Sequence, residues 1–149
     1  MLLLAKHLEQ EIRDHGAKDY PHECCGAMLG TDGDGAGREV RALFPLINRR
    51  DDSPRNRFSI TPEDFRAAER AAAERGLDLL GWYHSHPDHP ARPSEFDREH
   101  AWPWYSYVIV SVDGGVPKDL TSWLLEDDRS KFQLEEVVAD RAAGQGKQG

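Results

Sequence analysis

A mostly apolar strand that ends in two histidines constrains this chain more than any other stretch. The run from Leu77 to Tyr83 continues directly into His84 and His86, which a single serine separates. Side chains alternate between the faces of a β-strand, so we expect both imidazoles on the same face. Asp97 follows after a loop that contains three prolines. Two imidazoles and a nearby carboxylate are three of the four ligands that a catalytic zinc ion needs.

The same residues also have a purely structural interpretation. A bare His-x-His pair at a strand end is often just hydrogen-bonded at the surface, and Ser94-x-x-Asp97 matches the capping box that begins a helix. The chain contains a second such box, Thr61-x-x-Asp64, with no histidine beside it, so the box alone is no evidence for a metal. Both roles are compatible, because the start of a helix would hold Asp97 rigidly while its carboxylate faces the metal.

A different metal site is also compatible with this stretch. The run from His84 to His89 matches the His-x-His-x-Asp-His pattern of metallo-β-lactamase-like hydrolases, with Asp88 and His89 as ligands. That fold takes further ligands from histidines far downstream, whereas the last histidine here is His100, and the chain is short for it. We therefore expect Asp88 and His89 at the rim of the site.

Periodicity and turn residues predict alternating helices and strands. Leu4, Leu8 and Ile12 recur at helical spacing. Glycine and proline punctuate the rest of the chain. The expected helices run from Leu4 to His15-Gly16, from the Thr61 cap and Pro62 to Arg75 with a stop at Gly76, and from the Ser94 cap to Ala101. Strands are expected at 27–30, 40–47, 58–60, 77–83, 105–112, 120–125 and 132–137, an exposed turn at 31–37, a loop at 48–56 and a disordered tail at 141–149.

Composition limits what the chain binds. Its 149 residues suit one domain, which we place at 1–140, and its formal net charge is −8. An acidic chain without a basic stripe argues against nonspecific nucleic-acid binding and against anionic membrane surfaces. No signal peptide or membrane span is evident. The adjacent Cys24 and Cys25 would bridge only with strain, so we expect reduced, packed thiols in a cytoplasmic protein. A redox role for one of them lacks a visible resolving partner.

Two separated motifs resemble those of one known family. The run His84-x-His86-Pro87 followed by Ser94-x-x-Asp97 resembles the signature of the JAMM (MPN+) metalloproteases. The segment from Pro21 to Gly26 resembles the part of bacterial members that carries a glutamate, here Glu23. The resemblance extends over roughly residues 4–137. It implies an α/β fold, a single domain with a central mixed β-sheet flanked by helices, of the MPN/JAB1, cytidine-deaminase-like type.

The resemblance also implies a role for each motif residue. His84, His86 and Asp97 would hold one zinc ion per chain and leave a fourth position for water. Glu23 would take a proton from that water and deliver it to the leaving amine. Ser94 would donate a hydrogen bond to the developing oxyanion.

Other aromatic and imidazole side chains near these motifs have no assigned role. Tryptophans beside a buried strand belong to the core more often than to a substrate groove, so we expect the former for Trp82, Trp102 and Trp104. The histidines expected at the surface or behind the site are His7, His15, His22 and His100.

The resemblance finally implies a substrate class. JAMM enzymes cut isopeptide or peptide bonds after the C-terminal Gly-Gly of ubiquitin or ubiquitin-like proteins. With only ten residues between His86 and Asp97 and no long insertion after them, the chain is similar to the small stand-alone bacterial members. Our preferred hypothesis is a zinc metalloprotease that acts on the tail of a sulfur-carrier protein in cysteine or cofactor sulfur metabolism. The competing class is a non-catalytic MPN scaffold, which usually lacks one or more of the metal ligands.

Overall fold

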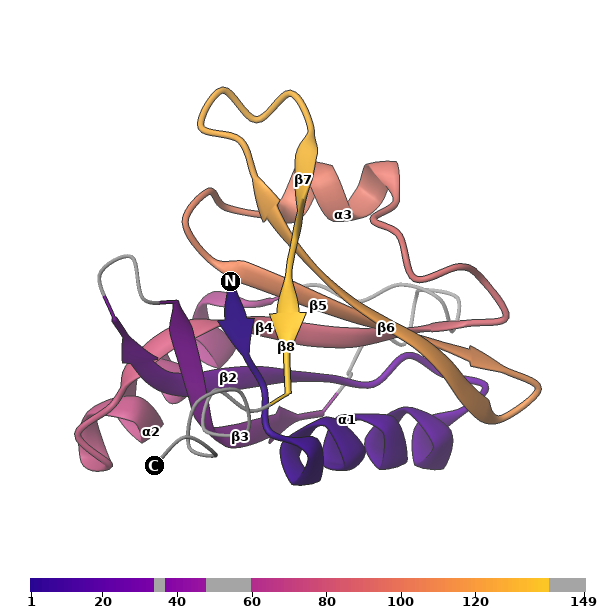
Figure 1. The fold of residues 1–149 in the computed structure, drawn as a ribbon, viewed down its shortest axis with the longest axis horizontal. Helices are drawn as coiled ribbons and strands as arrows, with labels where there is room; N and C mark the ends of the chain where they lie inside the picture. Colours follow the sequence, from indigo (N-terminus) through magenta and orange to yellow (C-terminus); the bar gives the residue numbers. More distant parts are fainter. Residues whose placement is uncertain (34–36, 48–59, 140–149) are drawn as a thin grey trace, which may run out of the picture.

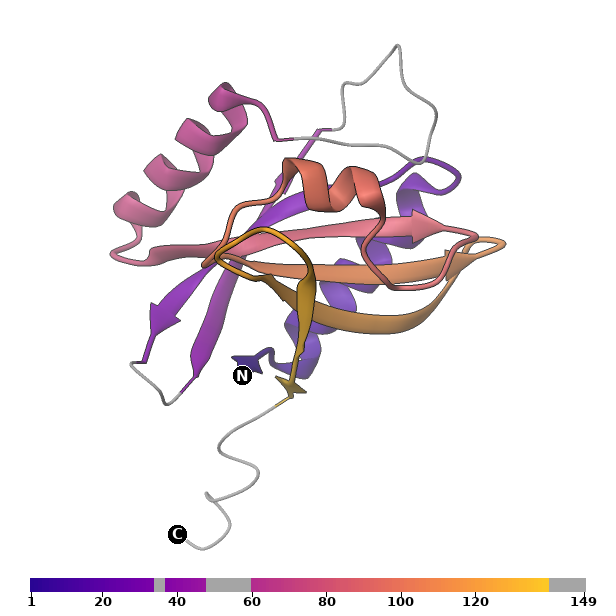
Figure 2. The same cartoon turned by 90° about the horizontal axis from the view of Figure 1, so that it is seen from above.

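A computed structural model, which describes residues 1–33, 37–47 and 60–139, contains the three predicted helices and most of the predicted strands. These residues form one sheet that carries α1 on one face and α2 and α3 on the other (Figures 1 and 2). The helices are α1 (Lys6–Asp19), α2 (Pro62–Glu74) and α3 (Glu95–His100). The strands are β1 (Leu2–Leu3), β2 (Cys25–Asp32), β3 (Arg38–Leu46), β4 (Asp78–Pro87), β5 (Ser106–Asp113), β6 (Val116–Leu125), β7 (Phe132–Glu135) and β8 (Val137–Val138).

The sheet is mixed, and one of its two central strands, β4, carries His84 and His86. Its described strands follow the order β7-β6-β5-β4-β2-β3-β1-β8. β4 and β5 are parallel to each other, β1 is parallel to both of its neighbours, and the remaining pairs are antiparallel. β4 and β5 are buried along almost their whole length, as expected for strands that are covered on both faces.

Two apolar cores fix the helices on the sheet. One fills the space between α1 and the sheet, and the other fills the space between α2 and the opposite face. Full burial of one large aliphatic side chain contributes about 1.5–3 kcal/mol, so these layers hold β4 firmly in place. Members of the two cores include Leu8, Ile12, Val108 and Val110 on the α1 side and Ala68, Ala72, Trp82 and Tyr107 on the α2 side.

The second and third predicted helices are confirmed at their caps. Thr61 caps α2 through a complete capping box, Pro62 is its first residue, and the chain leaves it through Gly76 at a φ of +67°. A left-handed φ of this kind favours glycine. Ser94 caps α3 in the same way as Thr61 caps α2.

The predicted end of the first helix is wrong. α1 does not stop at His15-Gly16 but continues to Asp19. Gly16 is buried against the sheet, where a Cβ atom would lie 3.1 Å from Cγ2 of Val112 and 3.4 Å from Cβ of Ser85. The glycine therefore permits close packing of helix on sheet, which compensates its lower helix propensity of about 1 kcal/mol relative to alanine.

The sequence pattern did not reveal the two shortest strands. β1 pairs with β3 and with β8, so the predicted strand at 132–137 is divided between β7, which pairs with β6, and β8. β2 also extends to Asp32, into the predicted turn at 31–37. The predictions for 34–36, for the loop at 48–56, for Phe58 and Ser59, and for the tail at 141–149 lie outside the described residues. The domain end at residue 140 stays a prediction, and no described helix is long and apolar enough to cross a membrane.

Candidate metal centre and active site

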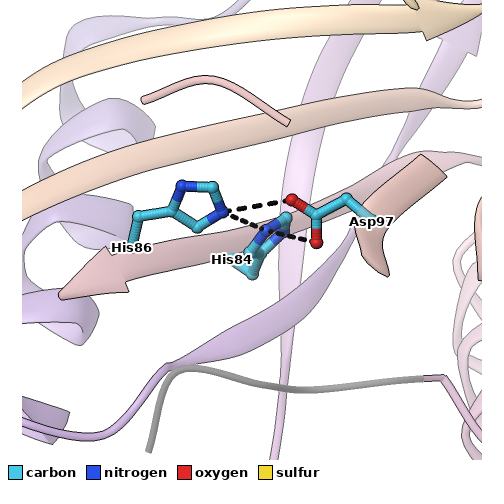
Figure 3. A group of neighbouring side chains, drawn as sticks. All are labelled: His84, His86 and Asp97. Atoms are coloured by element: carbon cyan, nitrogen blue, oxygen red, sulfur yellow. Dashed lines mark hydrogen bonds and ion pairs between the residues drawn. The ribbon is translucent and has the colours of Figure 1, made fainter. Parts of the chain in front are cut away.

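Two imidazoles lie side by side on one face of β4, as the alternation predicts. His84 and His86 have exposed fractions of only 2% and 7%. Their Nε2 atoms are 3.1 Å apart (Figure 3). Because β4 is buried on both faces, the strand holds the two rings in a fixed relation to each other.

Asp97 reaches both histidines from the first turn of α3. Ser94 Oγ accepts a hydrogen bond from the Asp97 backbone N–H at 3.0 Å, and Asp97 Oδ2 accepts one from the Ser94 N–H at 2.8 Å. The same carboxylate places Oδ2 3.2 Å from His86 Nε2 and Oδ1 3.4 Å from His84 Nε2. The capping box thus fixes the side chain whose oxygens face the imidazoles, so both geometric roles that the sequence suggested occur together.

The donor atoms of these three side chains fit a metal ion. One ligand atom from each residue lies within 4.8 Å of the others. Donors about 2.0–2.1 Å from a tetrahedral zinc ion are separated by about 3.4 Å, close to the observed 3.1, 3.2 and 3.4 Å.

The tautomer of His86 also suits a metal ligand. His86 Nδ1 lies 2.8 Å from the carbonyl oxygen of Pro90. A carbonyl only accepts, so Nδ1 carries the proton and Nε2 of the neutral ring keeps its lone pair for the metal.

Glu23 lies beside this cluster, in the segment that joins α1 to β2. Its exposed fraction is 3%, and it lines a cleft of about 460 Å³ together with His86 and Ser94. The Cys24 N–H donates to Ser85 Oγ at 2.8 Å, and the Ser85 N–H donates to the Cys24 carbonyl at 3.2 Å. Ser85 separates the two histidines in sequence, so these bonds fix the position of Glu23 relative to them.

Comparison with known families decides what kind of chain has this geometry. Residues 5–126 match the family described as prokaryotic homologues of the JAB domain. The chain belongs to this family. It is 40% identical over 103 residues to a desampylase from Haloferax volcanii, and this match covers 68% of this chain and 71% of that protein. It is 35% identical over 114 residues to a "probable TtuB-protein conjugate cleaving protease" from Thermus thermophilus, which covers 76% of this chain and 72% of that protein.

Solved structures place the fold in the same group. A protein from Salinibacter ruber is 48% identical with a TM-score of 0.75, and the match covers 93% of this chain and 92% of that one. The structure described as "JAMM: a metalloprotease-like zinc site in the proteasome and signalosome" has a TM-score of 0.53 at 16% identity, over 93% of this chain and 98% of that one. The predicted JAMM/MPN resemblance and the mixed α/β fold are confirmed, and the chain is a JAMM-type hydrolase of peptide or isopeptide bonds.

Burial and charge set the ionisation of the side chains in this JAMM site. Burial opposes ionisation of the Asp97 carboxyl, but the imidazoles of His84 and His86 more than offset this and hold its pKa well below the usual range. Burial lowers the pKa of His84 against the opposing charge of Asp97, which favours the neutral, metal-binding ring. Burial, with the nearby charge of Asp97, raises the pKa of Glu23 to about 9.

Asp88 and His89 lie outside the group of side chains that could hold a metal ion. Within the described ranges, the side chains grouped to hold a metal are the two β4 histidines and Asp97. His89 lines the cleft, as expected for a rim residue. Asp88 instead accepts from the Tyr20 hydroxyl at 2.7 Å and from the Gly114 N–H at 2.8 Å. It thereby ties the segment before Glu23 to the turn between β5 and β6, a contact that no sequence signal predicted.

The predicted core position is right for one tryptophan and wrong for two. Trp82 is fully buried, whereas Trp102 and Trp104 are 41% and 48% exposed. Trp102 lines a separate groove of about 620 Å³ with Phe65, and none of the predicted site residues borders that groove. Trp104 packs beneath the guanidinium of Arg38, 4.1 Å from its ring centre.

The two cysteines fit their predicted packing role. Both Cys24 and Cys25 are free and buried. Burial raises the pKa of Cys24 to about 12 and also raises that of Cys25. Thiols in this state are poor nucleophiles, so neither is suited to catalysis.

Proposed function

We propose that the chain is a zinc-dependent isopeptidase or peptidase that cleaves the amide bond at the C-terminal Gly-Gly tail of a ubiquitin-like protein. One observation carries the proposal: His84, His86 and Asp97 bring three ligand atoms within 4.8 Å of one another. The buried Glu23 lines the same cleft as His86. A complete donor set also favours an enzyme over a scaffold that has lost its ligands.

His84, His86 and Asp97 would hold one zinc ion per chain. When bound, zinc lowers the pKa of a water molecule and polarises a substrate carbonyl. Glu23 takes the proton of the attacking water and transfers it to the leaving amine. Burial and the charge of Asp97 raise the pKa of Glu23 to about 9, which favours the protonated carboxyl. A divalent cation beside it would lower this pKa, because positive charge favours the carboxylate, the form that accepts a proton.

Ser94 would stabilise the oxyanion. This residue lines the cleft, and its hydroxyl oxygen accepts from the Asp97 N–H. A hydroxyl has one proton besides its acceptor lone pairs, so Ser94 retains an O–H that it can donate to the developing negative charge.

The substrate class rests on the relatives and on the cleft. Proteins named desampylase and TtuB-conjugate cleaving protease are 40% and 35% identical to this chain. The cleft beside the metal-binding atoms is bordered by Pro90 and Pro93, and a tail of two glycines can enter it extended, without side chains. Within this class we favour a sulfur-carrier protein as the substrate and, given the two buried free thiols, the cytoplasm as the location.

A defined substrate tests the proposal directly. Zinc-loaded protein is incubated with a ubiquitin-like carrier whose Gly-Gly tail is extended by one amino acid or is joined to a lysine, and products are read by mass spectrometry. We expect release after the second glycine. An intact carrier beside fully loaded protein would reject the assigned substrate.

Glu23→Gln separates binding from chemistry. The amide keeps the shape of the side chain but cannot take a proton, so we expect wild-type zinc content with a turnover rate about 10²–10⁴-fold lower. Retained turnover in the zinc-loaded variant would remove Glu23 from the mechanism.

A further inference from the structure

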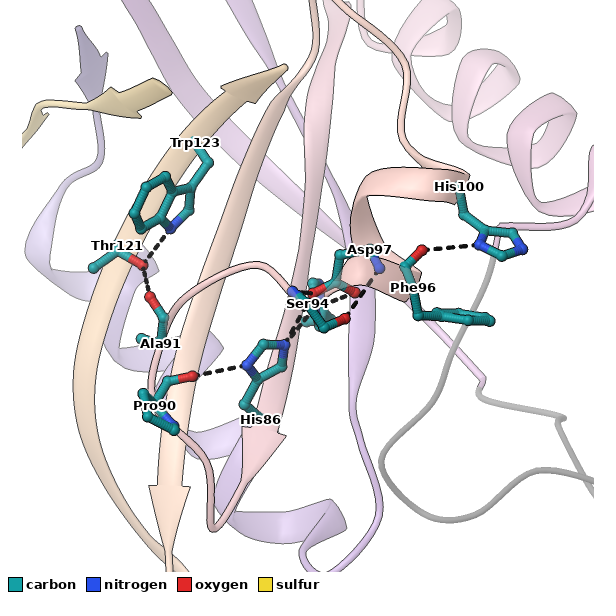
Figure 4. Close-up of polar contacts among 10 residues, drawn as sticks. His86, Pro90, Ala91, Ser94, Phe96, Asp97, His100, Thr121 and Trp123 are labelled. Atoms are coloured by element: carbon teal, nitrogen blue, oxygen red, sulfur yellow. Dashed lines mark hydrogen bonds and ion pairs between the residues drawn. The ribbon is translucent and has the colours of Figure 1, made fainter. Parts of the chain in front are cut away.

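Thr121 of β6 lies on the face of the sheet that carries the metal-binding side chains. His84 pairs in register with Ile109 of β5, and Ile109 pairs with Thr121. Residues in one such row point to the same face of a sheet. The loop between β4 and α3 passes over this row at Pro90 and Ala91, so Thr121 contacts the loop rather than the ligand atoms themselves (Figure 4).

A chain of hydrogen bonds leads from β6 to that loop. Trp123 Nε1 donates to Thr121 Oγ1 at 2.8 Å, and Thr121 Oγ1 donates to the Ala91 carbonyl at 2.7 Å. An indole N–H only donates, so the Thr121 oxygen acts as its acceptor and the one hydroxyl proton is left for Ala91. The carbonyl of Pro90, one residue earlier, accepts from His86 Nδ1 at 2.8 Å.

These contacts anchor the middle of the loop between β4 and α3. Pro90 and Arg92 are exposed, whereas Ala91 between them is only 5% exposed and rests on the sheet. The two consecutive carbonyls of this turn are therefore held between β6 and β4, one by Thr121 and the other by His86. If the Thr121 hydroxyl were absent, the Ala91 carbonyl would lose this donor and the Pro90 carbonyl would lose its fixed direction toward His86.

We propose that Thr121, oriented by Trp123, is a positioning residue that fixes the ring direction and tautomer of His86 through the Pro90–Ala91 turn, and thereby sets the metal affinity of the site. It touches neither substrate nor metal. The inference relies on the proposed function only in taking zinc as the metal.

Three variants isolate the hydroxyl. Thr121→Val keeps the β-branched shape but has no hydroxyl, and Thr121→Ser keeps the hydroxyl. Trp123→Phe removes the donor to that hydroxyl and leaves a smaller aromatic ring. Thr31→Val, at the opposite end of β2 from the site, is the matched control. Zinc alone is titrated into each full-length protein in competition with a chromophoric chelator, and the denaturant midpoint is measured in parallel.

Loss of a hydrogen-bonding partner behind a metal ligand typically weakens metal binding 10–100-fold, and we expect the lower end, about tenfold, for Thr121→Val. Trp123→Phe should give a smaller loss in the same direction, and Thr121→Ser and Thr31→Val should stay near wild type. Unchanged zinc affinity in Thr121→Val, or an equal loss in Thr121→Ser, would overturn the proposal. If Thr121→Val does not fold, Trp123→Phe against Thr31→Val decides in the same way.

A second readout does not depend on zinc. Nitrogen-15 NMR of the histidine rings in the zinc-free protein reports which nitrogen carries the proton. We expect His86 protonated at Nδ1 in the wild type and a mixture of tautomers in Thr121→Val, and an identical tautomer in both would overturn the positioning role. If no variant binds zinc but the tautomer shifts as expected, the proposed metal fails while the positioning role stands.

Discussion

At the residue scale, Asp97 and Asp64 perform the same capping task in different surroundings. Asp64 accepts from the Thr61 N–H at 3.2 Å, and Asp97 accepts from the Ser94 N–H at 2.8 Å. Asp97 differs from Asp64 in one respect: its carboxylate also faces the paired histidines and lies 3.2 Å from His86 Nε2. Asp64 is thus a natural control, since it shares the local sequence pattern but none of the metal-binding context.

Alanine at each of these two positions separates the cap from the ligand. Asp97→Ala and Asp64→Ala should each lower the free energy of unfolding by about 1 kcal/mol through the damaged cap. Loss of a residue that only supports a metal ligand weakens metal binding by up to about 100-fold. Zinc affinity should fall by more than this in Asp97→Ala, which loses a ligand, and should not change in Asp64→Ala. Zinc content after dialysis, with unfolding curves alongside, checks both, and equal zinc in the two variants would refute Asp97 as a ligand.

The sequence predicted the candidate site residues but not the hydrogen-bonding groups that fix their positions. Spacing along one strand predicted that His84 and His86 share a face, and the family resemblance supplied Glu23 from a distant segment. The Pro90 carbonyl that fixes the His86 tautomer and the Ser85 hydroxyl that fixes the backbone beside Glu23 carry no pattern of their own. Their roles depend on the path of a loop and on the pairing of β2 with β4, which only the folded chain determines.

At the element scale, polar contacts to the turn between β6 and β7 help to hold α3 in place. None of its residues is buried, although it carries Asp97. Arg129, in the turn between β6 and β7, donates to the carbonyls of Ala101 at 2.7 Å and Glu99 at 3.3 Å, and its own carbonyl accepts from Arg98 at 2.8 Å. The last carbonyls of a helix have no partner within it, so this guanidinium both satisfies them and fixes the helix on the sheet.

Arg129→Ala should therefore loosen the metal site from a distance. We expect zinc affinity to fall about tenfold, as for other supporting contacts, together with a stability loss of about 1–3 kcal/mol from the carbonyls left without their charged donor. Arg75→Ala is the matched control, because Arg75 donates to the Ala71 carbonyl near the end of α2, a helix without site residues. Competition titration with a chelator measures the affinity, and an equal loss in both variants would argue for a general effect of losing an arginine.

The elements that sequence patterns predicted are those with locally determined ends. α2 has its cap, its first-turn proline and its terminal glycine within its own stretch, and β4 contains the mostly apolar run that leads into the histidines. The end of α1 was missed because Gly16 serves contact with Val112 rather than chain reversal. β1 and β8 have two residues each, too few to show a period. β1 forms between β3 and β8, and β8 forms against β1.

At the scale of the whole molecule, the proposed zinc would link β4 to α3, which has no residue in either apolar core. Two ligands stand on the buried β4, the third stands on α3, and α3 contributes no buried residue to either core. A metal that binds the folded chain and not the unfolded one shifts the folding equilibrium by mass action. The shift should concentrate on α3, which has no buried residue among those that the structure describes.

Removing zinc should accordingly lower thermal stability and do so through α3. At a free zinc concentration 100 times the dissociation constant, binding contributes about 2.7 kcal/mol, which for a domain of this size corresponds to about 5–10 °C in the unfolding midpoint. We expect a chelator to lower the midpoint of the loaded wild type by this amount and to leave Asp97→Ala unchanged.

Hydrogen exchange on the same samples should quicken in α3 while α2, whose alanines are buried against the sheet, keeps its protection. A uniform loss of protection in both helices would mean that the metal stabilises the fold as a whole, and an equal fall of the midpoint in Asp97→Ala would mean that the chelator acts elsewhere than at this site.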